Sequence, residues 1–158
     1  MKFSTREDIN APIEQVFEML SEFHTYERSA LRRGAEVRRV DRLTLPGVGM
    51  MWKAAFVMRG KSRKLDITLA EYDQPNCMVF TSVSTGLTGL LSMDLMAMSR
   101  TRTRVSVALE VKPQNLSARL LIQSLRLAKS NLTKRFKQRV ADFARDIEER
   151  QSSISQTY

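Results

Sequence analysis

Few side chains in this sequence could transfer a proton near neutral pH. His24 is the only histidine, and histidine ordinarily changes charge in that range, so a general-base mechanism would use it first. Tyr72 and Asp94 are further candidates, although strand alternation turns Asp94 away from the main apolar face. No nucleophile elbow, phosphate-binding loop or dinucleotide-binding glycine pattern accompanies them. The candidate catalytic residues are therefore limited to these three.

Metal and redox chemistry have few candidate ligands. Cys77 is the only cysteine, and with His24 it provides two of the four ligands that a structural zinc site usually has. We therefore expect no metal ion and no cofactor. The chain forms no internal disulfide, has no apolar run of about 18 residues, and begins without the apolar core of a signal peptide. These features predict a soluble cytoplasmic protein.

An apolar stripe follows one face of a strand-like segment, residues 47–60. Every second residue of the stripe is apolar, and the set combines adaptable methionines with one tryptophan: Met50, Trp52, Ala54, Phe56 and Met58. The next segment alternates in the same way, with Leu65, Ile67 and Leu69 on one face. Two interpretations fit these faces: a solid core, or the wall of a cavity that binds an apolar molecule.

The elements that would position these residues follow a distinctive order. Residues 2–10 alternate like a strand, residues 11–20 have helical spacing with Asn10 as a cap, and residues 22–31 predict a second helix. A tight turn is expected at Arg59-Gly60, inside a series of strands. These six strands are predicted at 35–43, 48–59, 61–73, 77–85, 88–99 and 101–111.

The pattern of the C-terminal part predicts one long amphipathic helix. Asn115 is a candidate cap, and no glycine or proline follows Leu116, which favours a helix of about 30 residues. Its apolar stripe includes Leu121, Leu125, Ala128 and Leu132. We expect a single domain over residues 1–150 and a flexible tail over residues 151–158.

This order of elements predicts an α+β fold, with a seven-stranded antiparallel sheet wrapped around the long C-terminal helix and two short helices after the first strand. A helix about 10 Å across cannot cover so wide a sheet, so a gap should remain between them.

Three features together resemble the START/SRPBCC superfamily, whose fold is known as the helix grip. They are the opening strand followed by NAPIEQVFEMLSEFHTYER, the GVGMMW start of a central strand, and the long helix after Pro113. The resemblance covers about residues 1–150. It implies a hydrophobic cavity between sheet and helix, which in most members holds a lipid, sterol, polyketide or similar molecule.

Two functions follow from this interpretation. The favoured one is a non-catalytic carrier of a small hydrophobic ligand, lined by Met50, Trp52, Ala54, Phe56, Met58, Leu65, Ile67, Leu69, Leu121, Leu125, Ala128 and Leu132. The alternative is an enzyme of the polyketide cyclase or dehydratase type, in which His24, Asp94 or Tyr72 moves protons in the same cavity.

The charge distribution bears on other partners. The net charge is +9, and basic residues cluster at 59–64 and, without any acid, at 119–139. Such clusters attract phosphates, so weak contact with an anionic membrane is a further hypothesis. We expect no nucleic acid partner, because no base-reading element accompanies the charge. The segment 86–98 is apolar on both faces, which fits a homodimer contact, a patch that touches a membrane or an extra pocket wall. Of these we favour a partner contact, as in a homodimer.

Overall fold

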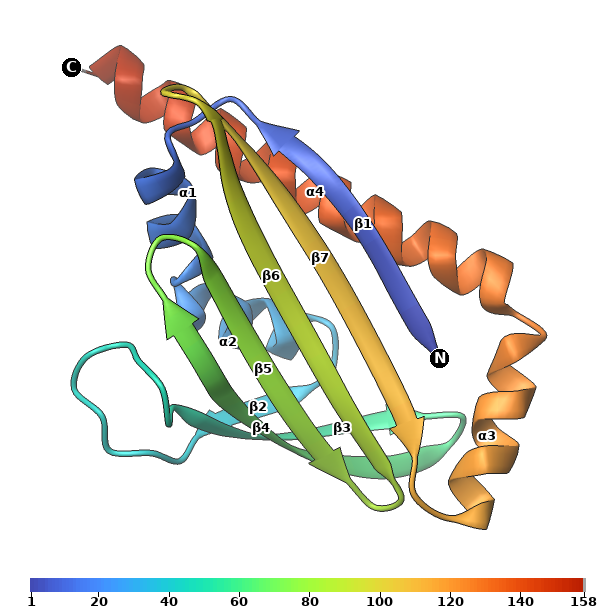
Figure 1. The fold of residues 1–158 in the computed structure, drawn as a ribbon. Helices are drawn as coiled ribbons and strands as arrows, with labels where there is room; N and C mark the ends of the chain where they lie inside the picture. The colour runs from blue at the N-terminus through green and yellow to red at the C-terminus, as the bar shows by residue number, and fades with distance from the viewer. Residues whose placement is uncertain (158) are drawn as a thin grey trace.

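The computed structural model of the chain describes residues 1–157, with side chains through Ile154. In this part of the chain, seven strands form one antiparallel sheet with the spatial order β1-β7-β6-β5-β4-β3-β2. Figure 1 shows the sheet curving from β1 towards β3. The strands are β1 (Lys2–Ile9), β2 (Glu36–Arg39), β3 (Met51–Met58), β4 (Lys61–Asp73), β5 (Cys77–Ser84), β6 (Leu87–Ser99) and β7 (Arg102–Pro113).

Short turns join consecutive strands from β3 to β7, which lie next to each other in the sheet. The turn between β3 and β4 consists of Arg59 and Gly60, with φ angles of 53° and 75°, and it pairs Met58 with Lys61. Two successive residues with positive φ match the right-handed twist of a hairpin. The tight turn predicted at this place is confirmed, as is the predicted seven-stranded helix-grip fold.

Four helices accompany the sheet in the described residues: α1 (Ile13–Leu20), α2 (Phe23–Arg32), α3 (Leu116–Arg126) and α4 (Lys129–Thr157). Figure 1 shows α1, α2 and α4 behind the sheet and α3 beside the end of β7. We call the face of the sheet towards the helices the inner face. Its buried residues include Met50, Leu69, Met78 and Val105, which pack against α1 and α2 in one core.

The prediction of one continuous C-terminal helix is wrong, because the helix is divided at Leu127 and Ala128. The Ala128 amide donates at 3.0 Å to the carbonyl of Leu125, three residues earlier, whereas an amide within an α-helix donates to the carbonyl four residues earlier. The chain bends at this place in Figure 1. The two helices pack in different places, since α4 lies along β1 whereas α3 contacts β7 and lies beside its end in Figure 1.

Two predicted helix boundaries also change. Asn10 does not cap α1, whose preceding residue is Pro12; its side-chain amide instead donates to Glu148 Oε1 at 3.0 Å, which ties the start of α1 to α4. Asn115 does cap α3, because its Oδ1 accepts from the Ala118 amide at 2.8 Å. Residues 151–157, predicted as a tail, continue α4, since no glycine or proline ends the helix, and Tyr158 lies outside the described residues.

Candidate ligand-binding cavity

Aromatic side chains fill the inner face beneath α2. The Phe23 ring lies 5.4 Å from Trp52, 6.1 Å from Phe80 and 6.4 Å from Tyr72 between ring centres. Trp52 Nε1 donates to Glu27 Oε1 at 2.9 Å, so the polar edge of the ring also has a partner. We call these four rings, Phe23, Trp52, Tyr72 and Phe80, the aromatic cluster. These ring contacts make this end of the inner face part of the packed core.

The predicted ligand-binding residues, on the sheet and on the C-terminal helices, divide into a buried and a half-buried set. Met50, Trp52, Ala54 and Leu69 are buried in the core. The other members of the predicted set are half-buried: Phe56, Met58, Leu65, Ile67, Leu121, Leu125, Ala128 and Leu132. The stripe on β3 is therefore solid core at one end and partly open at the other.

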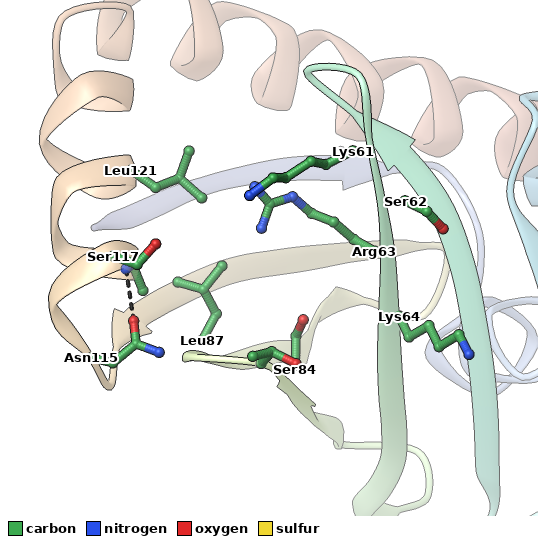
Figure 2. A pocket seen from close by; sticks show the side chains of 11 residues that line it. Lys61, Ser62, Arg63, Lys64, Ser84, Leu87, Asn115, Ser117 and Leu121 are labelled. Carbon is green, nitrogen blue, oxygen red and sulfur yellow. Dashed lines mark hydrogen bonds between the residues drawn. The ribbon is translucent and has the colours of Figure 1, made fainter.

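A cleft of about 610 Å³, open to solvent and with several exposed residues in its walls, lies at the open end, between the start of β4, the β5–β6 turn and α3. We call it the α3 cavity. Figure 2 shows its position, with Leu121 of α3 facing residues of β4. Of the predicted ligand-binding set, only Leu121 is among the residues that line it. The lining residues are Lys61, Ser62, Arg63, Lys64, Ser84, Thr85, Leu87, Asn115, Ser117, Ala118 and Leu121.

The position of α3 over this cavity is fixed by contacts with the β5–β6 turn. A Cβ atom added to Gly86 would lie 2.4 Å from Asn115 Nδ2, and the φ angle of Gly86 is +77°, so a glycine is required there on both counts. The backbone amide of Gln114 donates to the backbone carbonyl of Gly86 at 2.7 Å. On the other wall, Arg59 Nη1 donates to Ser124 Oγ at 2.8 Å and joins the β3–β4 turn to α3.

The lining of the α3 cavity is cationic. Lys61, Arg63 and Lys64 contribute positive charge, while no aspartate or glutamate is among the lining residues. Figure 2 shows Lys61 and Arg63 pointing towards α3, whereas Lys64 points away from it. The sequence alone identified a basic cluster at 59–64 but not its role in a cavity. The signal was present, since Lys61 and Arg63 share the parity of Leu65, Ile67 and Leu69 and therefore had to face inwards.

The three candidate catalytic residues lie apart from each other and from the cavity. The side chain of His24 is 79% exposed on α2, with Nδ1 3.4 Å from Glu27 Oε2. The Tyr72 hydroxyl donates to Ser21 Oγ at 2.8 Å, within the core. Asp94 is exposed on the outer face of β6, opposite Cys77. None of the three is among the residues that line the α3 cavity.

Cysteine chemistry has no support from the surroundings of Cys77. Burial and a hydrogen bond to Glu71 raise the pKa of the thiol to about 11, so it stays protonated near neutral pH. Within the described part of the chain, no three His, Cys, Asp or Glu side chains come together as a metal site. A search of the same residues finds no helix with the length and apolar character needed to span a bilayer.

Comparison with known proteins places the chain in a family. The family described as polyketide cyclase / dehydrase and lipid transport matches residues 1–148. The chain belongs to this family. The match confirms the resemblance to the START/SRPBCC superfamily. No curated protein sequence matches the chain.

Solved structures show how widely this family fold is shared. TTHA0849 from Thermus thermophilus matches with a TM-score of 0.67 and 18% identity over 98% of this chain and 99% of that one. The Zhui aromatase/cyclase from Streptomyces sp. R1128 has a TM-score of 0.60 and 8% identity, over 85% of this chain and 89% of that one. A START superfamily protein from Mycobacterium smegmatis has a TM-score of 0.55 and 12% identity, over 85% and 95%. At these identities the likeness concerns the fold alone.

The surfaces predicted to meet other partners are exposed. In segment 86–98, the outer face of β6 exposes Leu90, Met96 and Met98, while Leu95 is buried on the inner face. Homodimer formation through these residues stays a prediction, as do contact with anionic membranes and a cytoplasmic location.

Proposed function

We propose that this family member binds a small molecule with an apolar part in the α3 cavity and acts as its carrier. The observation that carries the proposal is the cavity itself, about 610 Å³ between a sheet and a helix. Pockets for small ligands typically have about 300–1,000 Å³, so one ligand of ordinary size fits.

The apolar part of the ligand would lie on the half-buried side chains that adjoin the cavity. Phe56 and Met58 are the cross-strand partners of Arg63 and Lys61, so they lie on the inner face directly beside the lining residues. Leu87 and Leu121 contribute apolar surface from the opposite sides. Covering this surface with an apolar ligand would contribute about 25 cal/mol for each Å² removed from water.

A cyclase-type enzyme is the alternative within the same family. Such chemistry needs a general acid or base within hydrogen-bond reach of the reacting atoms. The walls of the α3 cavity present cations, hydroxyls, an amide and apolar groups, and the candidates His24, Tyr72 and Asp94 lie elsewhere. The carrier is therefore the function that the geometry supports best.

Native mass spectrometry of the purified full chain tests the carrier proposal. We expect a stoichiometric adduct, identified after denaturing extraction, or uptake of one ligand from a mixed lipid extract. Leu121→Trp should weaken uptake because the larger ring takes up part of the cavity. Leu120→Trp is the matched control, since Leu120 is 58% exposed and is not among the lining residues. A wild-type chain that takes up nothing, or equal uptake by both variants, would contradict the proposal.

A further inference from the structure

Two cations on the inner face of β4 interrupt the apolar pattern of that strand. Lys61 and Arg63 share the face of Leu65 and Ile67, because alternate residues of a strand point to the same side. Two residues along a strand span about 7 Å, so their charges start close together. Both side chains extend towards α3 in Figure 2. Like charges in this arrangement repel each other unless an anion lies between them.

The described residues supply no anion to Arg63. Three arginines in this part of the chain are half-buried rather than exposed, namely Arg39, Arg63 and Arg104. Arg39 pairs with Asp41 at 2.9 Å, and Arg104 pairs with Asp8 at 2.8 Å, each through two nitrogens. Arg63, by contrast, has a buried Nε with no hydrogen-bond partner among these residues. Of these three half-buried arginines, Arg63 alone has no carboxylate partner among the described residues, and it is the one that lines the α3 cavity.

The remaining walls of the cavity suit an anion as well. Ser84, Thr85 and Ser117 provide hydroxyl donors, and the first turn of α3 contains no acid that would oppose a negative ligand. The cavity also lies at the N-terminal end of α3, where the backbone dipole is positive. Charge, hydroxyl donors and helix dipole thus favour the same sign of ligand.

We infer that the ligand of the α3 cavity is an anionic amphiphile, whose carboxylate or phosphate group is held by Lys61 and Arg63. Its apolar part lies against Phe56, Met58 and Leu121. This inference rests on the proposed carrier function and names the class of its ligand. A guanidinium and a neighbouring ammonium suit such a head group because charge-assisted hydrogen bonds to its oxygens satisfy both cations.

Isothermal titration of the full chain with matched ligands tests the inference. Decanoate and decyl phosphate carry the two candidate head groups, decan-1-ol has the same chain without charge, and inorganic phosphate has the charge without the chain. The test variant is Lys61→Gln with Arg63→Gln. The control variant is Arg38→Gln with Lys53→Gln, which removes two cations that lie opposite each other on the exposed outer face of β2 and β3.

We expect at least one of the charged amphiphiles to bind the wild type and the control variant equally. The test variant should bind it about tenfold more weakly or worse, as expected for the loss of charge-assisted hydrogen bonds. Decan-1-ol should bind more weakly than the charged ligand, with an affinity that the test variant does not change. The stronger of decanoate and decyl phosphate identifies the head group.

Other results overturn the inference and separate it from the carrier proposal. If decan-1-ol binds as tightly as the charged ligands, or the test variant keeps full affinity for them, the carrier proposal stands and the anionic head group is wrong. If only inorganic phosphate binds, or nothing binds, both fail. Circular dichroism checks that the test variant is folded, and Arg63→Gln alone replaces it if the double substitution prevents folding.

Discussion

The inner face of the sheet has two ends of opposite character. At one end, the aromatic cluster joins α2 to β3, β4 and β5, and the buried Trp52 nitrogen has its partner in Glu27. At the other end, α3 lies over a cavity of about 610 Å³, and the half-buried Arg63 has a nitrogen without a hydrogen-bond partner among the described residues. Both ends belong to the same alternating strands. The helices, rather than the strands, therefore decide whether an inward-facing residue is core or binding surface.

The largest effect is expected from truncation in the aromatic cluster. Phe23→Ala should lower the free energy of unfolding by about 3–5 kcal/mol, because it removes a buried ring that contacts four others. Urea denaturation measures this change. Leu31→Ala on the same helix is the control, since Leu31 is 64% exposed and should change stability by less than about 0.5 kcal/mol. Similar values for both variants would mean that the two ends are packed alike.

A smaller loss is expected from the turn that positions α3. Gly86→Ala places a side chain at φ +77° and against Asn115, so it should cost about 1–2 kcal/mol and weaken ligand uptake as α3 shifts. Gly47→Ala is the control, because no atom lies within 4 Å of an added Cβ there. Urea denaturation and native mass spectrometry of both variants measure the two effects. Normal uptake by Gly86→Ala would show that the cavity does not depend on this contact.

Acid should weaken the ion pairs that Asp8 forms with Arg102 and Arg104. Hydrogen bonds from Arg104 and Arg102 lower the pKa of Asp8 from 3.8 to about 2. Because the pKa of Asp8 is lower in the folded state, its carboxylate stabilises that state above pH 3.8. This contribution is lost as the pH falls from 3.8 through about 2. Urea midpoints between pH 4 and pH 2 should therefore fall more steeply for the wild type than for Asp8→Asn. If the urea midpoints of the two proteins fall equally with pH, Asp8 does not contribute to the loss of stability in acid.

The smallest effect on stability is expected at the cations of the cavity. Without ligand, Lys61→Gln with Arg63→Gln should leave the free energy of unfolding within about 0.5 kcal/mol of the wild type or slightly above it, because Lys61 is exposed and the described residues give Arg63 Nε no hydrogen-bond partner. Urea denaturation in ligand-free buffer measures this, beside Arg38→Gln with Lys53→Gln. A loss comparable to that of Phe23→Ala would mean that Lys61 and Arg63 have a structural role instead.

Strand alternation predicted most of the fold because it depends on local sequence. Met50, Trp52 and Ala54 are buried as their parity required, and Asp94 is exposed on the other face. The division of the C-terminal helix at Leu127 was not predictable in this way. Neither glycine nor proline marks it, and the two helices that it separates pack in different places, α4 along β1 and α3 beside the end of β7.

Strand alternation predicted an apolar inner face but not which part of it adjoins a cavity. Alternation put Trp52 and Phe56 on one face, but only the position of α2 makes the first a core residue and leaves the second half-buried. Lys61 and Arg63 carried a usable signal, because two cations on the parity of an apolar face are unusual. Their basic character favoured a surface interpretation of residues 59–64. Every residue of this segment is exposed except Arg63, which is half-buried, so the interpretation missed Arg63 alone.

The single tryptophan gives the molecule an optical label for one end only. Trp52 is the sole residue of its type, and it lies in the aromatic cluster, whereas no aromatic residue is among those that line the α3 cavity in the described chain. Its fluorescence emission should shift to longer wavelength when α2 detaches and the ring meets water. Ligand entry at the other end should leave that wavelength unchanged. A variant that loses its ligand but keeps this emission has therefore lost the site and not the fold.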